Sequence, residues 1–332
     1  MKYKSAKGFS GWGQLGILFV FVGVGFVITG IIQLVIGFSI IDPNIPWPQK
    51  GDAMMKALLK PGNSNWLQIS QISGTVFLMF LPAFIYSLIC NGKAKLWLGF
   101  SSYINLWQVI LGFFIIFCAN IVAQPVEELS KQIIFHFPYL NKKAAEFAAM
   151  YNEQVEAMAN LKTWSSLIIA LVVIAFFPAL FEEVFFRGAM QNLFIRWWKK
   201  PFWGIIITSL VFSLIHGEIY PFLSRAILGF ALGLMYYYSK NLWVNIIAHF
   251  LNNAFVIIQL FIVSRSSEKP DVSKLDQQFP LWAELVSILV FYALFLLFKK
   301  LSAKNKAAIE MDEQKLWIQS TPEYNLADNY PL

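Results

Sequence analysis

The sequence predicts an all-α fold, a polytopic membrane bundle of about eight transmembrane helices. Composition is the first reason: of 332 residues, 58% are hydrophobic, 17% aromatic and only 14% charged, which lies outside the usual soluble range. The second reason is that the sequence has eight apolar runs near the length of about 20 residues that a helix needs to cross a bilayer. They cover residues 12–40, 66–91, 104–123, 164–196, 201–217, 221–239, 241–263 and 280–298.

The first run follows the basic residues Lys2, Lys4 and Lys7. It is longer than a signal-peptide core and has no small-residue cleavage site, so we expect an uncleaved first span. Counting spans from there brings the later clusters of Lys and Arg to the same side. By the positive-inside rule both termini are then cytoplasmic.

We expect residues 1–298 to form a single transmembrane domain and residues 299–332 to form a cytoplasmic, disordered tail. Segment 125–163 mixes charges with apolar residues in a pattern typical of amphipathic helices at the membrane surface. It is either a connector or a lid for a membrane-bound substrate. Glycines 229 and 233 have the spacing that favours close packing between membrane helices.

Two other classes of function find no support. The formal charge is +7, but the basic residues gather at the ends of the spans, so we expect no nucleic-acid partner. Cys90 and Cys118 have no paired spacing, which argues against a disulfide framework or a cysteine metal site.

Three charged residues, Glu182, Glu183 and Arg187, lie within the apolar run 164–196. An ionisable group at such depth costs about 3 kcal/mol or more and normally faces the bundle interior or a wet cavity. Glu183 and Arg187 are four residues apart and can pair on one helix face, whereas Glu182 lies about 100° further round and is free for other contacts. Pro178, one turn earlier, is expected to bend the helix.

Two of the three histidines, His216 and His249, also lie inside predicted spans. Measured from the turn at Lys199 and Lys200, Glu182 lies roughly 25 Å and His216 roughly 24 Å along the two arms of a helical hairpin. His249 and Asn253 share one face of the seventh helix, because they are four residues apart. We therefore expect four polar side chains from three helices to meet within the membrane.

This set suits hydrolysis of a peptide bond by an activated water. A carboxylate in a low-dielectric site can serve as a general base, and His216 can share the protons of the same water. His249 and Asn253 could donate hydrogen bonds to the developing oxyanion. Taken singly, an intramembrane histidine bridges helices as often as it catalyses, Phe212 is expected to pack against His216, and Asn245 and Asn252 are expected to join helices.

The spacing Glu182-Glu183-x-x-x-Arg187, then Phe212-x-x-x-His216, then His249-x-x-x-Asn253 resembles the three ordered motifs of the CPBP family, which includes the CAAX prenyl endopeptidases and the bacterial Abi proteins. The resemblance covers about residues 164–263. It implies an intramembrane glutamic endopeptidase of the bacterial cytoplasmic membrane that acts on a membrane-embedded or lipidated peptide or protein. It also implies Glu182 and His216 as the water-activating pair, His249 and Asn253 as the oxyanion site, and Glu183 and Arg187 as support.

Other functions remain open on sequence alone. The same charged groups would serve an ion-coupled transporter, and intact motifs would serve a non-catalytic scaffold or immunity protein. Zinc could be held by His216, His249 and Glu182. We predict no cofactor, because Asn253 is a poor zinc ligand but a good oxyanion donor, and because Glu183 paired with Arg187 would be poorly placed to act as the base.

Overall fold

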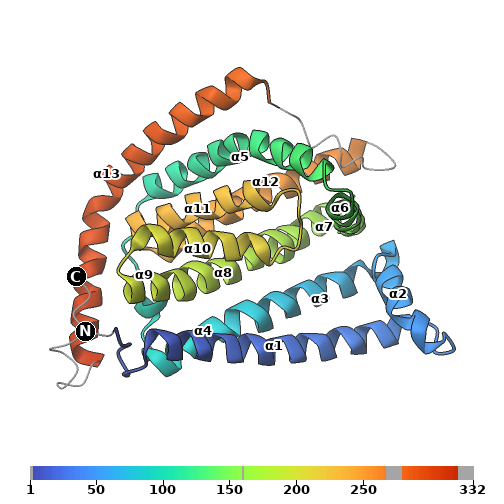
Figure 1. The fold of residues 1–332 in the computed structure, drawn as a ribbon, viewed down its shortest axis with the longest axis horizontal. Coiled ribbons are helices and arrows are strands. Elements are labelled where there is room, and N and C mark those ends of the chain that lie inside the picture. Colours follow the sequence, from blue (N-terminus) through green and yellow to red (C-terminus); the bar gives the residue numbers. More distant parts are fainter. Residues whose placement is uncertain (1–2, 159–160, 267–278, 321–332) are drawn as a thin grey trace.

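The structure is a computed structural model that describes residues 3–158, 161–266 and 279–320. Within these residues the regular structure is helical, apart from one isolated bridge between Lys4 and Ser10. The predicted all-α fold class is confirmed. The helices of Figure 1 are α1 (Gly11–Ile40), α2 (Trp47–Leu58), α3 (Ser64–Thr75), α4 (Leu81–Cys90), α5 (Leu106–Phe135), α6 (Pro138–Met158), α7 (Trp164–Ala170), α8 (Phe177–Glu183), α9 (Asn192–Trp198), α10 (Pro201–Leu214), α11 (Phe222–Ser239), α12 (Leu242–Ser266) and α13 (Leu281–Ser320).

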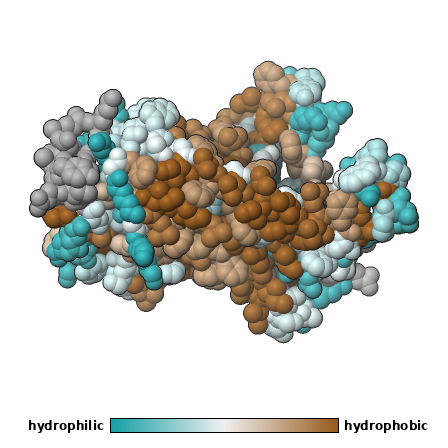
Figure 2. All heavy atoms as spheres, turned by 90° about the horizontal axis from the view of Figure 1, so that it is seen from below, coloured by the Kyte–Doolittle hydropathy of each residue, from teal (hydrophilic) through white to brown (hydrophobic). Residues whose placement is uncertain are grey.

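All eight apolar runs contain helix, and six of the helical stretches are long and apolar enough to cross a membrane. The remaining two are α10, which has only 14 residues, and α11, which has 18 and carries Arg225. Figure 2 shows an apolar surface between hydrophilic ends, as expected for a bundle surrounded by lipid. The polytopic bundle is confirmed, with eight as an approximate count. The six stretches are Gly11–Ile40, Ser64–Cys90, Leu106–Phe135, Trp164–Trp198, Leu242–Arg265 and Leu281–Ser320.

The stretch Trp164–Trp198 holds the two carboxylates and is interrupted by two π-helical segments, Leu171–Phe176 before α8 and Val184–Gln191 after it. Pro178 has no N–H to donate to the preceding turn. Just before it, the amide of Phe177 donates to the carbonyl of Val172, five residues back. The irregularity expected at Pro178 is therefore a widened turn, a feature that is frequent at functional sites.

α10 and α11 pack closely through the two glycines of α11. A Cβ atom at Gly229 would lie 3.1 Å from a ring carbon of Phe212, and one at Gly233 would lie 2.7 Å from Ile205. A Cβ atom at either position would require the neighbouring side chain to shift, so the predicted close packing is confirmed. Side chains of the π segment Val184–Gln191 and of α9 fill the adjacent core: Val184, Phe185, Phe186, Ala189, Met190, Leu193 and Phe194.

The clusters of basic residues come together at one end of the bundle. Lys7 donates to the carbonyl of Leu88 at the end of α4, and both Arg196 and Lys240 contact Glu313 of α13. This agrees with the expectation that these segments share one side of the membrane. That this side is cytoplasmic stays a prediction.

α13 continues as one helix to Ser320, so the prediction of a disordered tail from residue 299 is wrong as far as Ser320. The last turns are charged but amphipathic. Trp317 is buried, with its ring 5.7 Å from that of Trp97, and Ile309 is buried as well. The rest of the predicted tail, residues 321–332, lies outside the described residues.

The segment 125–163 contains the end of α5 and the largely exposed helix α6, which is seen end-on in Figure 1 and so crosses the direction of the main bundle. The hydroxyl of Tyr220, in the loop after α10, donates to Asn141 of α6 at 2.6 Å. α6 is thus tied to the loop that carries His216. Whether it acts as a connector or as a lid stays open, and residues 159–160 lie outside the described residues.

Candidate functional site

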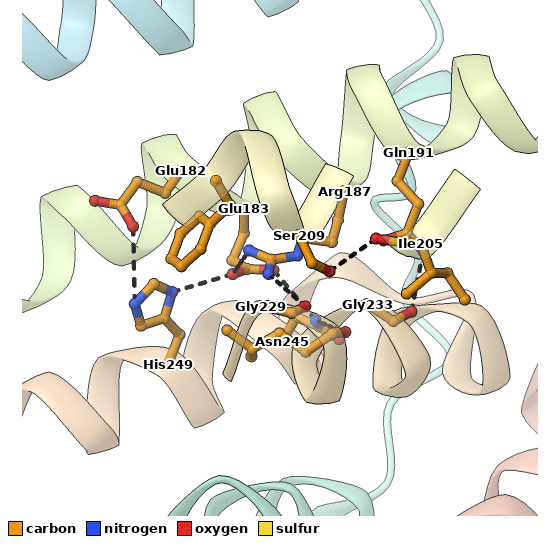
Figure 3. A network of polar contacts seen from close by, with 12 residues as sticks. Glu182, Glu183, Arg187, Gln191, Ile205, Ser209, Gly229, Gly233, Asn245 and His249 are labelled. Carbon is orange, nitrogen blue, oxygen red and sulfur yellow. Dashed lines mark hydrogen bonds and ion pairs between the residues drawn. The ribbon is translucent and has the colours of Figure 1, made fainter. Parts of the chain in front are cut away.

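A buried polar network connects α8 and the π segment after it to α11 and α12 (Figure 3). Glu183 and Arg187 form the predicted ion pair, with 2.6 Å between Arg187 Nη1 and Glu183 Oε1, and both side chains are fully buried. Arg187 Nη2 also donates to the carbonyl of Gly229 at 3.0 Å. One turn further on, Gln191 donates to the carbonyl of Gly233 at 2.9 Å. The close approach of α11 through its glycines therefore also supplies acceptors for these buried donors.

The carboxylate of Glu183 has two further partners, both on α12. His249 Nδ1 lies 3.0 Å from Glu183 Oε1, and Asn245 Nδ2 lies 3.2 Å from Glu183 Oε2. Because a carboxylate can only accept here, His249 carries its hydrogen on Nδ1, and Nε2 carries one as well only in the imidazolium form. Glu183 thus orients His249 in addition to pairing with Arg187.

Glu182 lies on the other side of the same histidine. Its Oε2 is 3.8 Å from His249 Nε2, longer than a hydrogen bond, and its side chain keeps about a tenth of its surface exposed. In Figure 3 its carboxylate points away from the Glu183–Arg187 pair. Glu182 therefore retains acceptor capacity, as predicted from its position about 100° round the helix.

His216 follows the C-terminal end of α10 and is exposed on the protein surface. Its Nδ1 lies 2.7 Å from the carbonyl of Phe212, so Nδ1–H donates and Nε2 presents a lone pair in the neutral ring. The ring of Phe212 packs against His216, with 4.8 Å between centroids, and lies 6.3 Å from the ring of His249. Both Glu182 and His249 are near enough to act electrostatically on His216. Phe212 has the packing role that was expected of it.

The three asparagines of α12 fall into two groups, because Asn252 lies on a different face of the helix from Asn245 and Asn253. Asn252 accepts a 2.7 Å hydrogen bond from Asn120 of α5, which confirms its helix-joining role. Asn245 also joins helices, through the carbonyl of Leu232, yet it contacts Glu183 as well, which was not foreseen. Asn253 is half-buried one turn after His249 and, among the described residues, is not a hydrogen-bond partner of Glu183. The four-residue spacing of Asn245, His249 and Asn253 was the signal that could have found Asn245.

An apolar groove of about 500 Å³ is lined by residues of the loop that carries His216, although His216 itself does not line it. Leu214 and Gly217, on either side of the histidine, line it together with Ile133 and Ile134 of α5. Its lining is almost wholly apolar. A hydrocarbon segment of a ligand could lie there with its polar part beside His216.

The side chains around His249 are also of the types that can hold a metal ion. Within the described part of the chain, no three His, Cys, Asp or Glu side chains are grouped as metal ligands would be. His249 directs one nitrogen to Glu183 at 3.0 Å and the other to Glu182 at 3.8 Å. The predicted independence from metal stays a prediction.

Comparisons with known proteins agree with the motifs. Residues 164–255 match the family described as type II CAAX prenyl endopeptidase Rce1-like, and this segment contains every motif residue from Glu182 to Asn253. The chain is also similar to the Bacillus subtilis (strain 168) protein named "Putative membrane peptidase YdiL", with 27% identity over 108 residues. That alignment covers 32% of this chain and 43% of YdiL, so the chain matches less than half of its relative. No solved structure matches significantly. The resemblance to the CPBP family is confirmed.

Proposed function

We propose that this chain, whose residues 164–255 match Rce1-like CAAX prenyl endopeptidases, is an intramembrane endopeptidase in which Glu182 activates water. One observation carries the proposal: His249 lies between two carboxylates with different surroundings. Glu183 is fully buried and engaged by three side chains, whereas Glu182 faces the second nitrogen of the ring across 3.8 Å. Of the two carboxylates, Glu182 is the one that keeps some exposed surface and can be reached by a substrate water.

In the first step Glu182 accepts a proton from the water, and the oxygen of the water attacks the carbonyl carbon of the scissile bond. In this proposal His216 Nε2 accepts a hydrogen bond from the same water, for which its lone pair is free because Nδ1–H is donated to Phe212. When the tetrahedral intermediate breaks down, the proton passes to the leaving amine. No covalent bond to the protein is needed.

The negative charge that forms on the carbonyl oxygen needs hydrogen-bond donors in place before the reaction. The amide of Asn253 would supply one, and His249 Nε2 would supply a second when it carries a hydrogen. Glu183 serves as the positioning residue, because its contact with Nδ1 fixes the ring. The apolar groove beside His216 supports a substrate that is membrane-embedded or lipidated.

The test compares cleavage by wild-type protein with cleavage by Glu182→Gln and His216→Ala variants. Each protein is reconstituted in liposomes with a library of membrane peptides, and the products are identified by mass spectrometry as new peptide termini. We expect both substitutions to lower the rate by about 100-fold or more, the scale of a lost general base.

His136→Ala is the matched control for His216→Ala. His136 is also exposed and also directs Nδ1 to the carbonyl four residues earlier, Gln132, but it lies at the end of α5 outside the network. The His136→Ala variant should cleave peptides at the wild-type rate. Wild-type cleavage by folded Glu182→Gln protein would disprove the mechanism. If no membrane peptide is cleaved and Glu182→Gln still complements a deletion strain, the scaffold alternative is supported.

A further inference from the structure

A second pocket lies at the basic end of the bundle and is not part of the network around Glu183. It has a volume of about 340 Å³ and is bounded by the turn between α9 and α10, the end of α11 and the last turns of α13. Its lining contains four cationic side chains and two carboxylates, a balance of 4 − 2 = +2. These are Arg196, Lys199, Lys240, Lys306, Glu310 and Glu313.

The ion pairs within the pocket do not neutralise it. Glu313 is shared between two cations, at 3.4 Å from Arg196 Nη2 and 3.0 Å from Lys240 Nζ. Glu310 lies 3.8 Å from Lys306, and within the described residues Lys199 has no carboxylate partner. The positive charge that remains favours an anionic ligand.

Two of these cations occupy a backbone conformation that disfavours lysine. Lys199 ends α9 with φ of 51°, and Lys240 ends α11 with φ of 54°. Glycine or asparagine is usual at such a left-handed helix end. A need for positive charge at positions 199 and 240 would explain why lysine occupies both of them. The C-terminal ends of the two helices also favour a cation.

Trp317 forms a buried part of the pocket wall. This residue lines the pocket and is only 3% exposed, yet its indole Nε1–H has no hydrogen-bond acceptor. An indole N–H can only donate, and a buried donor without a partner is costly. The nitrogen itself is covered by protein atoms, so Trp317 contributes an aromatic wall to the pocket and its N–H does not face a ligand there.

We propose that this pocket binds the anionic headgroup of a phospholipid. The phosphate oxygens would accept hydrogen bonds from Lys199 and Lys240. The choice of a lipid over a free anion rests on position: α10 begins beside the pocket at Pro201 and exposes Phe202 and Trp203, the aromatic signature of the bilayer interface. The acyl chains can then follow the apolar helix surface away from the headgroup.

The experiment measures lipid binding to the purified full-length protein by native mass spectrometry. Phosphatidylglycerol and phosphatidylcholine with identical acyl chains are titrated, and inorganic phosphate is added alone in a third arm. We expect phosphatidylglycerol to bind more tightly than phosphatidylcholine. The double variant Lys199→Asn/Lys240→Asn, in which asparagine tolerates the left-handed backbone, should weaken phosphatidylglycerol binding roughly 30-fold, about a factor of five per basic residue.

The matched control is Lys300→Gln/Lys304→Gln, which removes two exposed charges of α13 that do not line the pocket. It should leave the affinity unchanged, and an equal loss in this variant would overturn the proposal, since general surface charge would then explain binding. Phosphate binding as tight as that of phosphatidylglycerol would show that the ligand is a free anion, which contradicts the proposed lipid.

Discussion

The substitution Glu183→Gln separates the two roles that the structure gives this residue. Glutamine keeps the size of the side chain but removes the charge that compensates the fully buried Arg187. Breaking a buried pair from one side typically costs about 3–5 kcal/mol, because the remaining charge is left without a partner. We expect a loss of unfolding free energy of that size, measured by titration with denaturing detergent in mixed micelles and followed by circular dichroism.

An exposed ion pair on α6 provides the control. Lys143 and Glu146 approach to 2.7 Å, nearly the same distance as Arg187 and Glu183, but both side chains are more than 40% exposed. Because solvent screens such a pair, Glu146→Gln should not change stability measurably. The comparison holds distance constant and varies burial.

The double variant Glu183→Gln/Arg187→Met then tests the positioning role. Removing the buried cation as well should restore most of the stability, since a neutral or apolar pair of similar volume is often tolerated. Peptide cleavage should stay low, because His249 faces a neutral amide in place of the carboxylate at 3.0 Å. Full recovery of cleavage would show that Glu183 is structural only. Wild-type stability of Glu183→Gln alone would refute the estimate for the buried pair.

Two further predictions concern metal and packing. Active protein should contain no stoichiometric zinc by elemental analysis and should keep its activity in a strong chelator; zinc whose removal abolishes activity and whose return restores it would recast His216 and His249 as ligands. Gly229→Val should cost about 1–3 kcal/mol of unfolding free energy and lower cleavage, because the new side chain would displace Phe212. Gly16→Val, at a position with open space, should do neither, and equal effects of the two would contradict the packing explanation.

The sequence predicts those features of the fold that depend on local spacing. Apolar runs identify the membrane helices because each run must satisfy its backbone hydrogen bonds within one helix. The Glu183–Arg187 pair follows from four-residue spacing on one helix, and the packing of Gly229 and Gly233 from the absence of side chains. The convergence of Phe212, His216 and His249 follows from the helical hairpins, since helices joined by short turns lie side by side.

Residue spacing in the sequence does not predict the contacts between helices that are distant in the chain. The hydrogen bond from His249 to Glu183 depends on the rotation of α12 about its own axis, which a sequence with three candidate asparagines on that helix leaves undetermined. The order of α13 up to Ser320 depends on Trp317 meeting Trp97, a residue some 200 positions earlier. A charged segment with scattered apolar residues looks disordered until the surface that covers those residues is known.

The different roles proposed for the two adjacent carboxylates rest on the different directions in which their side chains point. Glu183 points to the interface of α11 and α12, where Arg187, His249 and Asn245 use its lone pairs. Glu182, about 100° away, meets only the far nitrogen of His249 at a distance too long for a hydrogen bond. A base must hold its lone pairs free until the substrate arrives, whereas a positioning residue must have them occupied. The same pair of side chains can therefore fix one histidine and leave one carboxylate available for water, and an exchange of their roles would require the helix to turn by more than a quarter of a revolution.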